Sequence, residues 1–514
     1  MERLAPEFTE EVVGHWGIWE GIRELVQNAL DEMLDYERVP GYENVYRVKQ
    51  GKIVYKKETP TKLVIRDYGR GITVESLTKV GVSRKKPAGR GRFGEGTKYG
   101  VIALLREGCK VTFESPIIGK IEGKLVGKKP RTFVWEVVSK KTRIKKGTKV
   151  TVEGAVNVPD DRFIGVTFSP RVVAKSKTVK NHYKVDEEGF IVAYPWERDY
   201  GTAPGKIFVV ETVDTMVDYP NKIYVRDIYV ADTPKKSLYS YNIWRELPPN
   251  VFHRDRSFMN YQEFRVYATG IWLNCSDARA IKRFFKTVIV DKAKVFESDL
   301  MFERNEPYHA DVWRKAIRSV VGKDTVLYVP YYNHSPELVK MFGYKPVAIP
   351  ANLRGIYFTY DKTYSWLVEK HKSEMRKIIP DHELSETELK KLNILREIAK
   401  FVHENFYEKI AEVARKDPFY YDAPNFMDEI VAADFLEEAK KKIAGEHLSH
   451  REGRKILIWY EYLTEKKPLY EAIRVLVHEL AHHYFGVYDE SISDMRLALE
   501  YLSAFALEYI YSKL

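Results

Sequence analysis

The sequence is poor in cysteine and has no long uninterrupted apolar stretch. Its 514 residues include two cysteines, Cys109 and Cys275, too few for the disulfide framework of a small secreted domain or for a cysteine metal knuckle. No apolar run approaches the roughly 18 residues of a membrane span, and the first 20 residues lack the basic-then-apolar pattern of a secretory signal. These absences exclude the membrane and disulfide-stapled classes, and we expect a cytoplasmic protein that does not contact membranes.

Charge of both signs is abundant, so the excess of one sign is small. The chain has 84 Lys and Arg against 73 Asp and Glu, a net charge of +11, and a pI near 9.1. A basic excess attracts polyanions such as nucleic acid or ATP, whereas mixed charge is typical of a solvated surface. Abundant Lys, Glu and Tyr with few Cys and Met is also typical of heat-tolerant proteins.

The chain is long enough for several domains, and it contains no internal repeat. We predict a multidomain α+β fold: residues 1–155 mix helices and strands, 156–305 are rich in strands, 306–378 form a small α/β unit, and 379–514 are mainly helical. Apolar residues at helical spacing predict helices over residues 16–34, 99–105, 278–288, 386–415, 426–443, 469–485 and 489–514. One β-type run, residues 455–460, interrupts the helical part.

The first predicted helix carries a polar stripe on an otherwise apolar sequence. Glu24, Asn28 and Asp31 are spaced i, i+4, i+7 and therefore share one face. A carboxylate and an amide one turn apart could hold a hydrated Mg²⁺ and activate a water molecule. A merely solvated face is the alternative interpretation.

An acidic residue followed by two glycines comes after the next β-type run. In Asp67-Tyr68-Gly69-Arg70-Gly71, the glycines would let a flat ring approach the backbone while the carboxylate accepts a hydrogen bond from an amino group. An ordinary Asp-x-Gly turn is the alternative.

A glycine-rich, basic segment precedes the helix predicted at 99–105. Its glycines would expose backbone N–H groups at a helix N-terminus, and its cations would add positive charge, so the segment favours a bound phosphate. The residues concerned are Gly91, Gly94 and Gly96 with Arg90, Arg92 and Lys98. The spacing matches neither the dinucleotide-binding fingerprint nor a P-loop.

In this order and spacing, these segments resemble the boxes of the GHKL ATPase superfamily, which includes gyrase-type topoisomerases, heat-shock chaperones, mismatch-repair clamp proteins and histidine kinases. The boxes are Glu24-x-x-x-Asn28-x-x-Asp31, Asp67-x-Gly69-x-Gly71 and Gly91-x-x-Gly94-x-Gly96, with Gly147-Thr148 before a later strand. The resemblance covers residues 1–155 and implies an α/β sandwich (Bergerat fold) that binds ATP. Only His15 precedes the first box, which argues against a histidine kinase.

The resemblance implies ATP and Mg²⁺ as cofactors and assigns roles to residues. Glu24 would be the general base and Asn28 would bind Mg²⁺, while Asp67, supported by Thr148, would accept a hydrogen bond from the adenine amino group. The other box residues that would contact the nucleotide are Asp31, Gly69, Gly71, Gly91, Gly94, Gly96 and Lys98.

Some relatives sense the γ-phosphate with a Lys or Arg from a second domain, called a transducer. Residues 156–305 stand where such a transducer-like domain would be expected. No motif selects the residue, and the candidates are Lys235, Lys236, Arg254 and Arg256.

A second constellation, His478-Glu479-Leu480-Ala481-His482, lies inside the apolar helix predicted at 469–485. Two histidines four residues apart share a helix face and can bind Zn²⁺, and Glu479 could accept a proton from a metal-bound water. A structural or vestigial metal site, or a chance match, is the alternative.

This motif resembles the zincin metalloproteases, and it implies a zincin-like domain over residues 379–514. In zincins an edge strand, as expected at residues 455–460, pairs with an extended peptide substrate. The third zinc ligand would be acidic and lie on the next helix, with Asp494 favoured over Glu490 and Glu500. No third histidine follows, which departs from the metzincin pattern.

Together the two constellations predict a Mg-dependent ATP-binding and hydrolysing protein whose nucleotide state regulates a zinc metallopeptidase site, with a peptide or protein substrate. As in clamp-type relatives, ATP binding could also cause the N-terminal domains of two chains to form a homodimer. Two alternatives stay open. One is an ATP-operated DNA-handling clamp with structural zinc, which the net charge and the run Arg283-Phe284-Phe285-Lys286 favour. The other is a chaperone-like remodeller.

Overall fold

The computed structural model describes most of the chain in detail: residues 3–4, 8–79, 88–90, 95–185, 191–193, 206–245, 260–302, 305–330, 334–371, 374, 376–415, 429–435, 445–447, 455–485, 499, 502–504, 506–507 and 509–510. The chain divides into two compact units, one of Met1–Gly322 with Pro350–Tyr360 and one of Lys323–Ile349 with Asp361–Leu514. The architecture is multidomain α+β, as predicted. None of the described helices combines the length and apolar character needed to span a bilayer.

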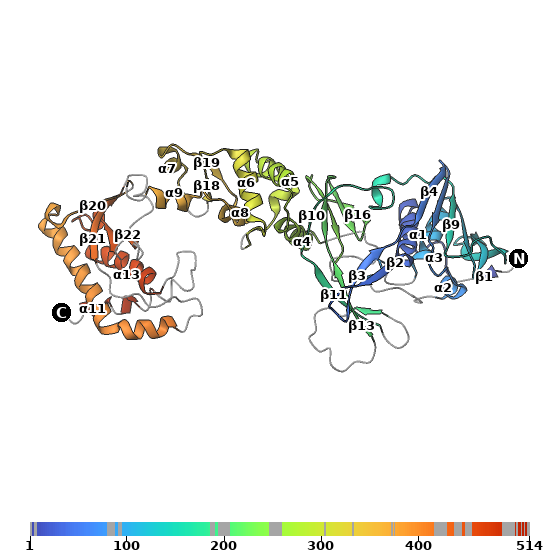
Figure 1. Ribbon diagram of the computed structural model, residues 1–514, viewed down its shortest axis with the longest axis horizontal. Helices are drawn as coiled ribbons and strands as arrows, with labels where there is room; N and C mark the ends of the chain where they lie inside the picture. The colour runs from blue at the N-terminus through green and yellow to red at the C-terminus, as the bar shows by residue number, and fades with distance from the viewer. Residues whose placement is uncertain are drawn as a thin grey trace. The chain divides into compact units, whose positions relative to one another are not determined.

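The first unit begins with a seven-stranded sheet in which all neighbouring strands are antiparallel (Figure 1). In spatial order its strands are β1 (Arg3–Leu4), β8 (Thr132–Ser139), β7 (Gly119–Val126), β6 (Lys110–Ser115), β9 (Lys149–Glu153), β5 (Lys62–Arg66) and β4 (Val54–Thr59). Two helices, α1 (Ile18–Glu32) and α3 (Gly96–Arg106), pack against this sheet and against each other, and a short helix α2 (Val74–Thr78) follows β5.

The apolar face of α1 explains why it forms and where it lies. Ile22, Leu25, Val26 and Leu30 recur at helical spacing and are buried in the core between helix and sheet. The Glu20 carboxylate accepts a hydrogen bond from the Gly17 N–H at 2.9 Å, which satisfies one donor at the helix start.

The two helices cross closely because glycines lie at the crossing. A Cβ on Gly100 would come within 3.1 Å of the Gly21 carbonyl oxygen, so a larger residue would force the helices apart. The predicted helices at 16–34 and 99–105 are thereby confirmed, with α3 beginning three residues earlier than expected.

A second sheet crosses the domain boundary expected at residue 155. The hairpin of β2 (Leu34–Arg38) and β3 (Val45–Gln50) joins strands from much later in the chain, because β3 pairs in parallel with β13 (Figure 1). The sheet order is β12 (Ile191–Ala193), β11 (Val179–Val185), β13 (Lys206–Thr212), β3 and β2. Residues 34–50 therefore join the mixed region predicted over residues 1–155 to the strand-rich region predicted over residues 156–305.

A third sheet and a group of helices complete the first unit. The sheet order is β10 (Val172–Lys175), β14 (Thr215–Val217), β17 (Ser240–Ile243), β15 (Lys222–Val225) and β16 (Ile228–Asp232). The helices are α4 (Tyr261–Leu273), α5 (Ala278–Phe284), the π-helix η2 (Phe285–Val290), α6 (Ala310–Val321) and α8 (Arg354–Thr359), with 3₁₀ turns η1 (Asp160–Arg162), η3 (Phe296–Asp299) and η5 (Ala351–Leu353). The sequence predicts strands and a helix at 278–288 here, but α4 was not predicted.

The second unit starts with a small parallel pair of strands, β18 (Thr325–Tyr328) and β19 (Lys345–Ala348), with helices α7 (Pro336–Met341) and α9 (Tyr364–Lys370). The sequence predicts a small α/β unit over residues 306–378. Part of that stretch, however, including α6 and α8, belongs to the first unit.

The remainder of the second unit contains a four-stranded sheet that the sequence analysis did not predict. In spatial order the strands are β20 (Arg376–Ile379), β21 (Glu429–Phe435), β23 (Lys455–Trp459) and β22 (Gly445–His447). Two long helices, α11 (Glu386–Arg415) and α13 (Leu469–Phe485), pack on it, and both have the predicted bounds. Turns η6 (Asp381–Glu383) and η8 (Tyr460–Tyr462) are 3₁₀.

The helix predicted over residues 426–443 is wrong where the structure describes that stretch, because residues 429–435 form β21. Ile430 and Ala432 are buried in the core beneath the helices, while Val431 and Ala433 are buried with Leu457 in a second cluster. A strand that is buried on both faces lacks alternation, and its short apolar run cannot be distinguished from a helix by periodicity alone.

Candidate functional site

Glu24 and Asn28 both face the beginning of α3. Glu24 is buried, and its Oε1 accepts hydrogen bonds from the Arg23 guanidinium at 3.2 and 3.3 Å. The Asn28 amide donates to Thr97 Oγ1 at 2.8 Å. Two of the three residues predicted on this stripe therefore meet the first turn of a helix 69 residues further along the chain.

Gly96 is the residue that lets the Glu24 carboxylate lie so close to α3. A Cβ built on Gly96 would overlap Glu24 Oε2, so any side chain there would displace the carboxylate. The N–H groups of the first turn of a helix carry partial positive charge. The arrangement thus places a carboxylate and an amide beside backbone donors, and N–H groups at a helix start are of the kind that bind phosphate.

Asp67 and Thr148 are brought together by the pairing of β5 with β9. Asp67 Oδ1 accepts hydrogen bonds from the Gly69 N–H at 2.9 Å and the Thr148 N–H at 3.2 Å, and neither bond uses Oδ2. Thr148 Oγ1 accepts the Ile72 N–H at 3.0 Å. Burial raises the pKa of Asp67 to about 6, although the backbone hydrogen bonds from Gly69 and Thr148 oppose this shift.

Two glycines make this close approach possible. Gly147 has φ +75° and Gly71 has φ +88°, a region that other residues rarely adopt. A Cβ on Gly147 would overlap the Asp67 carbonyl oxygen, and one on Gly71 would lie 3.3 Å from the Gly147 carbonyl oxygen. The two glycines therefore let the backbone of the Asp67 turn pack directly against the segment at Gly147.

The sequence analysis missed an ion pair that holds the Asp67 turn. Glu32, at the end of α1, accepts from the Arg70 guanidinium at 2.8 and 3.2 Å. A Cβ on Gly69 would come within 2.8 Å of Glu32 Oε2, so this glycine gives the carboxylate its room. The sequence contained a signal for this ion pair, since Glu32 directly follows the first box and Arg70 lies inside the second.

Lys98 has a different environment from the one expected of a phosphate ligand. Its side chain is fully buried, and Nζ donates to the Ser76 carbonyl in α2 at 2.9 Å. Burial lowers the pKa of Lys98. In this structure Lys98 supports α2, and its contact with phosphate stays a prediction.

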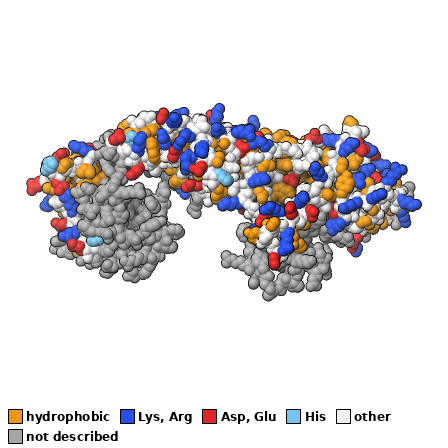
Figure 2. Space-filling model, in the orientation of Figure 1, with side chains coloured by type: hydrophobic (Ala, Val, Ile, Leu, Met, Phe, Trp, Pro, Cys, Tyr) orange, Lys and Arg blue, Asp and Glu red, His pale blue; other side chains and the backbone are white. Residues whose placement is uncertain are grey.

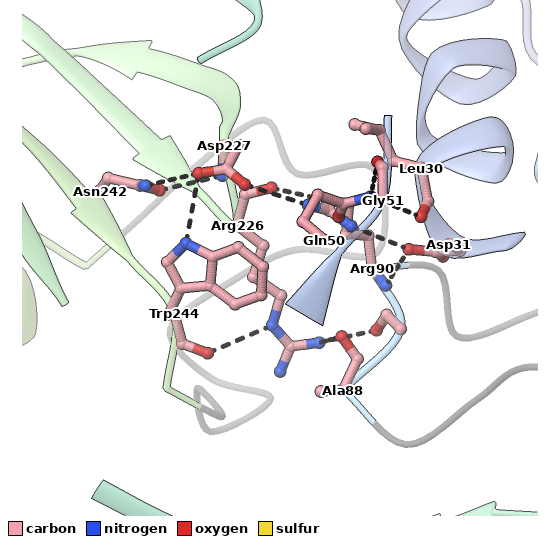
Figure 3. Close-up of polar contacts among 11 residues, drawn as sticks. Leu30, Asp31, Gln50, Gly51, Ala88, Arg90, Arg226, Asp227, Asn242 and Trp244 are labelled. Carbon is pink, nitrogen blue, oxygen red and sulfur yellow. Dashed lines mark hydrogen bonds and ion pairs between the residues drawn. The ribbon is translucent and has the colours of Figure 1, made fainter. Parts of the chain in front are cut away.

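Asp31 and Arg90 contact each other. Asp31 Oδ1 accepts the Arg90 N–H at 2.8 Å and the Arg90 guanidinium at 3.4 Å (Figure 3). The expectation that the Arg90 side chain adds charge to a phosphate site is wrong in this structure, because that side chain is fully buried and also bonds to Asp227. Gly91, Arg92 and Gly94 lie outside the described residues.

The candidates for a γ-phosphate sensor are only partly described. Lys235 is exposed and pairs with Asp299 at 2.6 Å, and Lys236 is also exposed. Arg254 and Arg256 lie outside the described residues. The structure thus selects none of these residues.

Part of the predicted zinc motif is described, on α13. The Glu479 side chain is buried and that of His478 is half-buried. The His482 side chain and the candidate third ligands Glu490, Asp494 and Glu500 lie outside the described part of the chain. Within the described part, no three metal-ligating side chains gather in one group.

The predicted edge strand of the C-terminal domain is wrong. Residues 455–459 of this run form β23, which lies between β21 and β22, and Tyr460 begins the turn η8. Among the described strands, β22 forms one edge of the sheet and β20 the other, and β22 runs antiparallel to β23, with Gly445 paired with Ile458 and His447 with Ile456. The edge at β22 is therefore contributed by a segment with no strand signal in the sequence analysis.

The basic and aromatic run at residues 283–286 does not offer stacking surfaces. Phe284 and Phe285 are fully buried, whereas Arg283 and Lys286 are exposed on the α5–η2 segment. Figure 2 shows Lys and Arg mixed with Asp and Glu on the face in view. The aromatic residues of this run therefore cannot stack on bases.

Comparison with known proteins gives little information about function. No protein-family model matches the chain. An uncharacterized protein of Mycoplasma pneumoniae (strain ATCC 29342 / M129 / Subtype 1) is 30% identical over 151 residues, which are 28% of this chain and 56% of that protein. The chain thus spans about half the length of this relative, and the resemblance to GHKL ATPases rests on the residues described above.

Proposed function

We propose that the chain is a Mg-dependent ATPase of the GHKL type whose nucleotide state regulates a zinc metallopeptidase site near the C-terminus. The observation that carries the ATPase proposal is the assembly of two parts of a nucleotide site from distant segments. One part is the Asp67–Thr148 turn with its closely packed glycines, and the other is Glu24 with Asn28 at the start of α3.

The residues present fit Mg-ATP. Oδ2 of Asp67 is not used by the bonds to Gly69 and Thr148, so it can accept a hydrogen bond from the adenine amino group. Gly71 and Gly147 let the backbone segments pack closely at this turn and add no side chain beside Asp67. Asn28 supplies an oxygen ligand of the kind that Mg²⁺ prefers.

The chemistry follows from the positions of these side chains. Mg²⁺, when bound, would supply charge neutralisation at the phosphates. Glu24 Oε2, directed at the first turn of α3, would orient a water molecule and accept its proton, while Arg23 holds Oε1. The N–H groups of that turn would bind the phosphate oxygens.

A calorimetric titration of the full chain tests the ATPase proposal. We expect one site for ADP and for a non-hydrolysable ATP analogue, with dissociation constants between about 1 μM and 1 mM, as is usual for enzyme substrates. Chelating Mg²⁺ should weaken binding of the ATP analogue by at least about tenfold. Absence of binding by every adenine nucleotide would contradict the proposal.

The peptidase part of the proposal is supported by the second unit. The helix with His478 and Glu479 follows β23, and the antiparallel strand beside β23 forms one edge of the sheet. An extended peptide can add to such an edge through main-chain hydrogen bonds. Zinc, when bound by His478 and His482, would supply a Lewis acid, and Glu479 would accept a proton from the attacking water.

Elemental analysis and a peptide-cleavage assay test this part. We expect about one zinc per chain, and Glu479→Gln should lower cleavage by about 10²- to 10⁴-fold while zinc stays bound. Glu471→Gln, on the first turn of the same helix, is the matched control and should cleave normally. A metal-free protein would contradict the peptidase, and equal cleavage with and without ATP would contradict the regulation.

A further inference from the structure

A buried ionic cluster joins α1 to the turn between β15 and β16. Asp31 of α1 bonds to the backbone and side chain of Arg90, and the Arg90 guanidinium bonds to Asp227 at 3.1 Å (Figure 3). The Arg90 side chain is fully buried, and those of Asp31 and Asp227 are 7% and 16% exposed. One cation thus links two carboxylates from segments 196 residues apart, Asp31 and Asp227, and screening by water is weak there.

The β15–β16 turn also donates hydrogen bonds to the segment that contains Arg90, through the side chain of Arg226. Arg90 Nε donates to the Arg226 carbonyl at 2.6 Å, and the Arg226 guanidinium donates to the carbonyls of Ala88 and Gly89 at 3.1 and 2.6 Å. Two arginines therefore hold residues 88–90 against the turn from both sides. Packing alone would not need this number of buried polar bonds.

The turn itself has a conformation that its residues rarely adopt. Arg226 and Asp227 have φ of +50° and +73°, where a two-residue hairpin loop usually has Asn-Gly or Gly-Gly. Each residue instead contributes a side chain to the cluster, and Asn242 and Trp244 also donate to Asp227. Such backbone strain persists only where the surroundings hold it, and it is concentrated at functional positions.

The cluster acts on the helix that carries the proposed catalytic residues. Asp31 lies one turn after Asn28 and two turns after Glu24, on the same face of α1. In addition, Gln50 of β3 donates to the Leu30 carbonyl at 3.1 Å, so a strand of the second sheet also bonds to α1. The Asp67–Thr148 turn is held by the pairing of β5 with β9, and the Glu32–Arg70 ion pair also joins it to the end of α1.

We infer that Arg90 is a positioning residue that couples α1, with Glu24 and Asn28, to the β10-β14-β17-β15-β16 sheet through Asp31 and Asp227. This inference rests on the proposed ATPase. Arg90 sets where Glu24 and Asn28 lie relative to the adenine-binding turn, so hydrolysis depends on the cluster much more than ADP affinity, which the Asp67 turn provides. A movement of the third sheet would accordingly change the rate of hydrolysis.

The test separates the rate constant from affinity in the full-length protein. Arg90→Met and Asp227→Asn should each lower kcat by about 5- to 100-fold, because a misplacement of catalytic groups by about 1 Å can cost about 100-fold in rate, and leave the dissociation constant of ADP within about twofold. The double variant should lose no more than the worse single variant, because both remove one interaction. Arg90→Lys should restore part of the rate.

A matched control is Arg171→Met, which removes another arginine that pairs with two carboxylates, Asp218 and Asp277, in the same unit. It should leave kcat and affinity unchanged. The inference is overturned if the cluster variants keep the wild-type kcat, or if kcat and ADP affinity fall in parallel. If Arg90→Met does not fold, the nearly isosteric Asp227→Asn decides. Failure of the wild-type protein to bind nucleotide would instead reject the proposed function itself.

Discussion

Replacing Glu24 with glutamine is expected to abolish ATP hydrolysis and to leave nucleotide bound. Glutamine keeps the volume and the acceptor for Arg23 but cannot take a proton, and removal of a general base typically costs about 10²- to 10⁴-fold in rate. Steady-state phosphate release gives kcat, and titration with a non-hydrolysable ATP analogue gives the affinity, which should change by less than about threefold.

The matched control for this variant is Glu20→Gln, one turn earlier on α1. Glu20 lies about 6 Å before Glu24 along the helix axis, and its carboxylate caps the helix at Gly17. Hydrolysis by this control should be close to that of the wild type. A wild-type rate in Glu24→Gln would show that another residue is the base.

Replacing Asp67 with asparagine is expected to weaken ADP binding by about 10- to 100-fold, the usual loss when a site built to hydrogen-bond a ligand loses that bond. The variant can keep the Oδ1 acceptor for Gly69 and Thr148, but an NH₂ group then takes the place of Oδ2 and faces the adenine amino group. Asp160→Asn, at an exposed ion pair with Lys57, is the control and should bind normally. Unchanged affinity in Asp67→Asn would remove this residue from the adenine site.

The pH dependence of the same residue gives a second measurement. Because the pKa of Asp67 is raised to about 6, ADP affinity should fall as pH drops through 6, and this fall should be absent in Asp67→Asn. The raised pKa means that the folded chain holds the proton more tightly than the unfolded chain. The contribution of Asp67 to stability is therefore greatest below pH 4 and is lost as pH rises through 6.

Thermal unfolding checks the sign of this effect. At pH 7–8 the buried carboxylate is charged, and this charge destabilises the folded state. Asp67→Asn should therefore unfold at a higher temperature than the wild type, with a gain in unfolding free energy of at most about 3 kcal/mol. At pH 4 the difference should vanish. A variant that binds ADP poorly and is also less stable at pH 8 would indicate a structural role instead.

Much of the candidate site could be predicted because its signals are local. The stripe of Glu24, Asn28 and Asp31 requires only that residues 18–32 be helical, and apolar periodicity determines that. The glycines at 71 and 147 mark backbone that other residues avoid. The burial of individual side chains could not be predicted from such local signals. Lys98 and Arg90 are basic residues in a glycine-rich segment, and yet both are buried.

The long helices could be predicted from local pattern, and their bounds at 386–415 and 469–485 agree with the structure, because a helix satisfies its backbone hydrogen bonds within one segment and shows its buried face in a 3.6-residue period. Which distant segments meet is visible only in the folded chain. The pairing of β3 with β13, the burial of β21 on both faces and the bridge from Asp31 through Arg90 to Asp227 depend on partners far away in the chain. No local pattern records such partners, because the free energy of each contact comes from the burial and charge of both sides together.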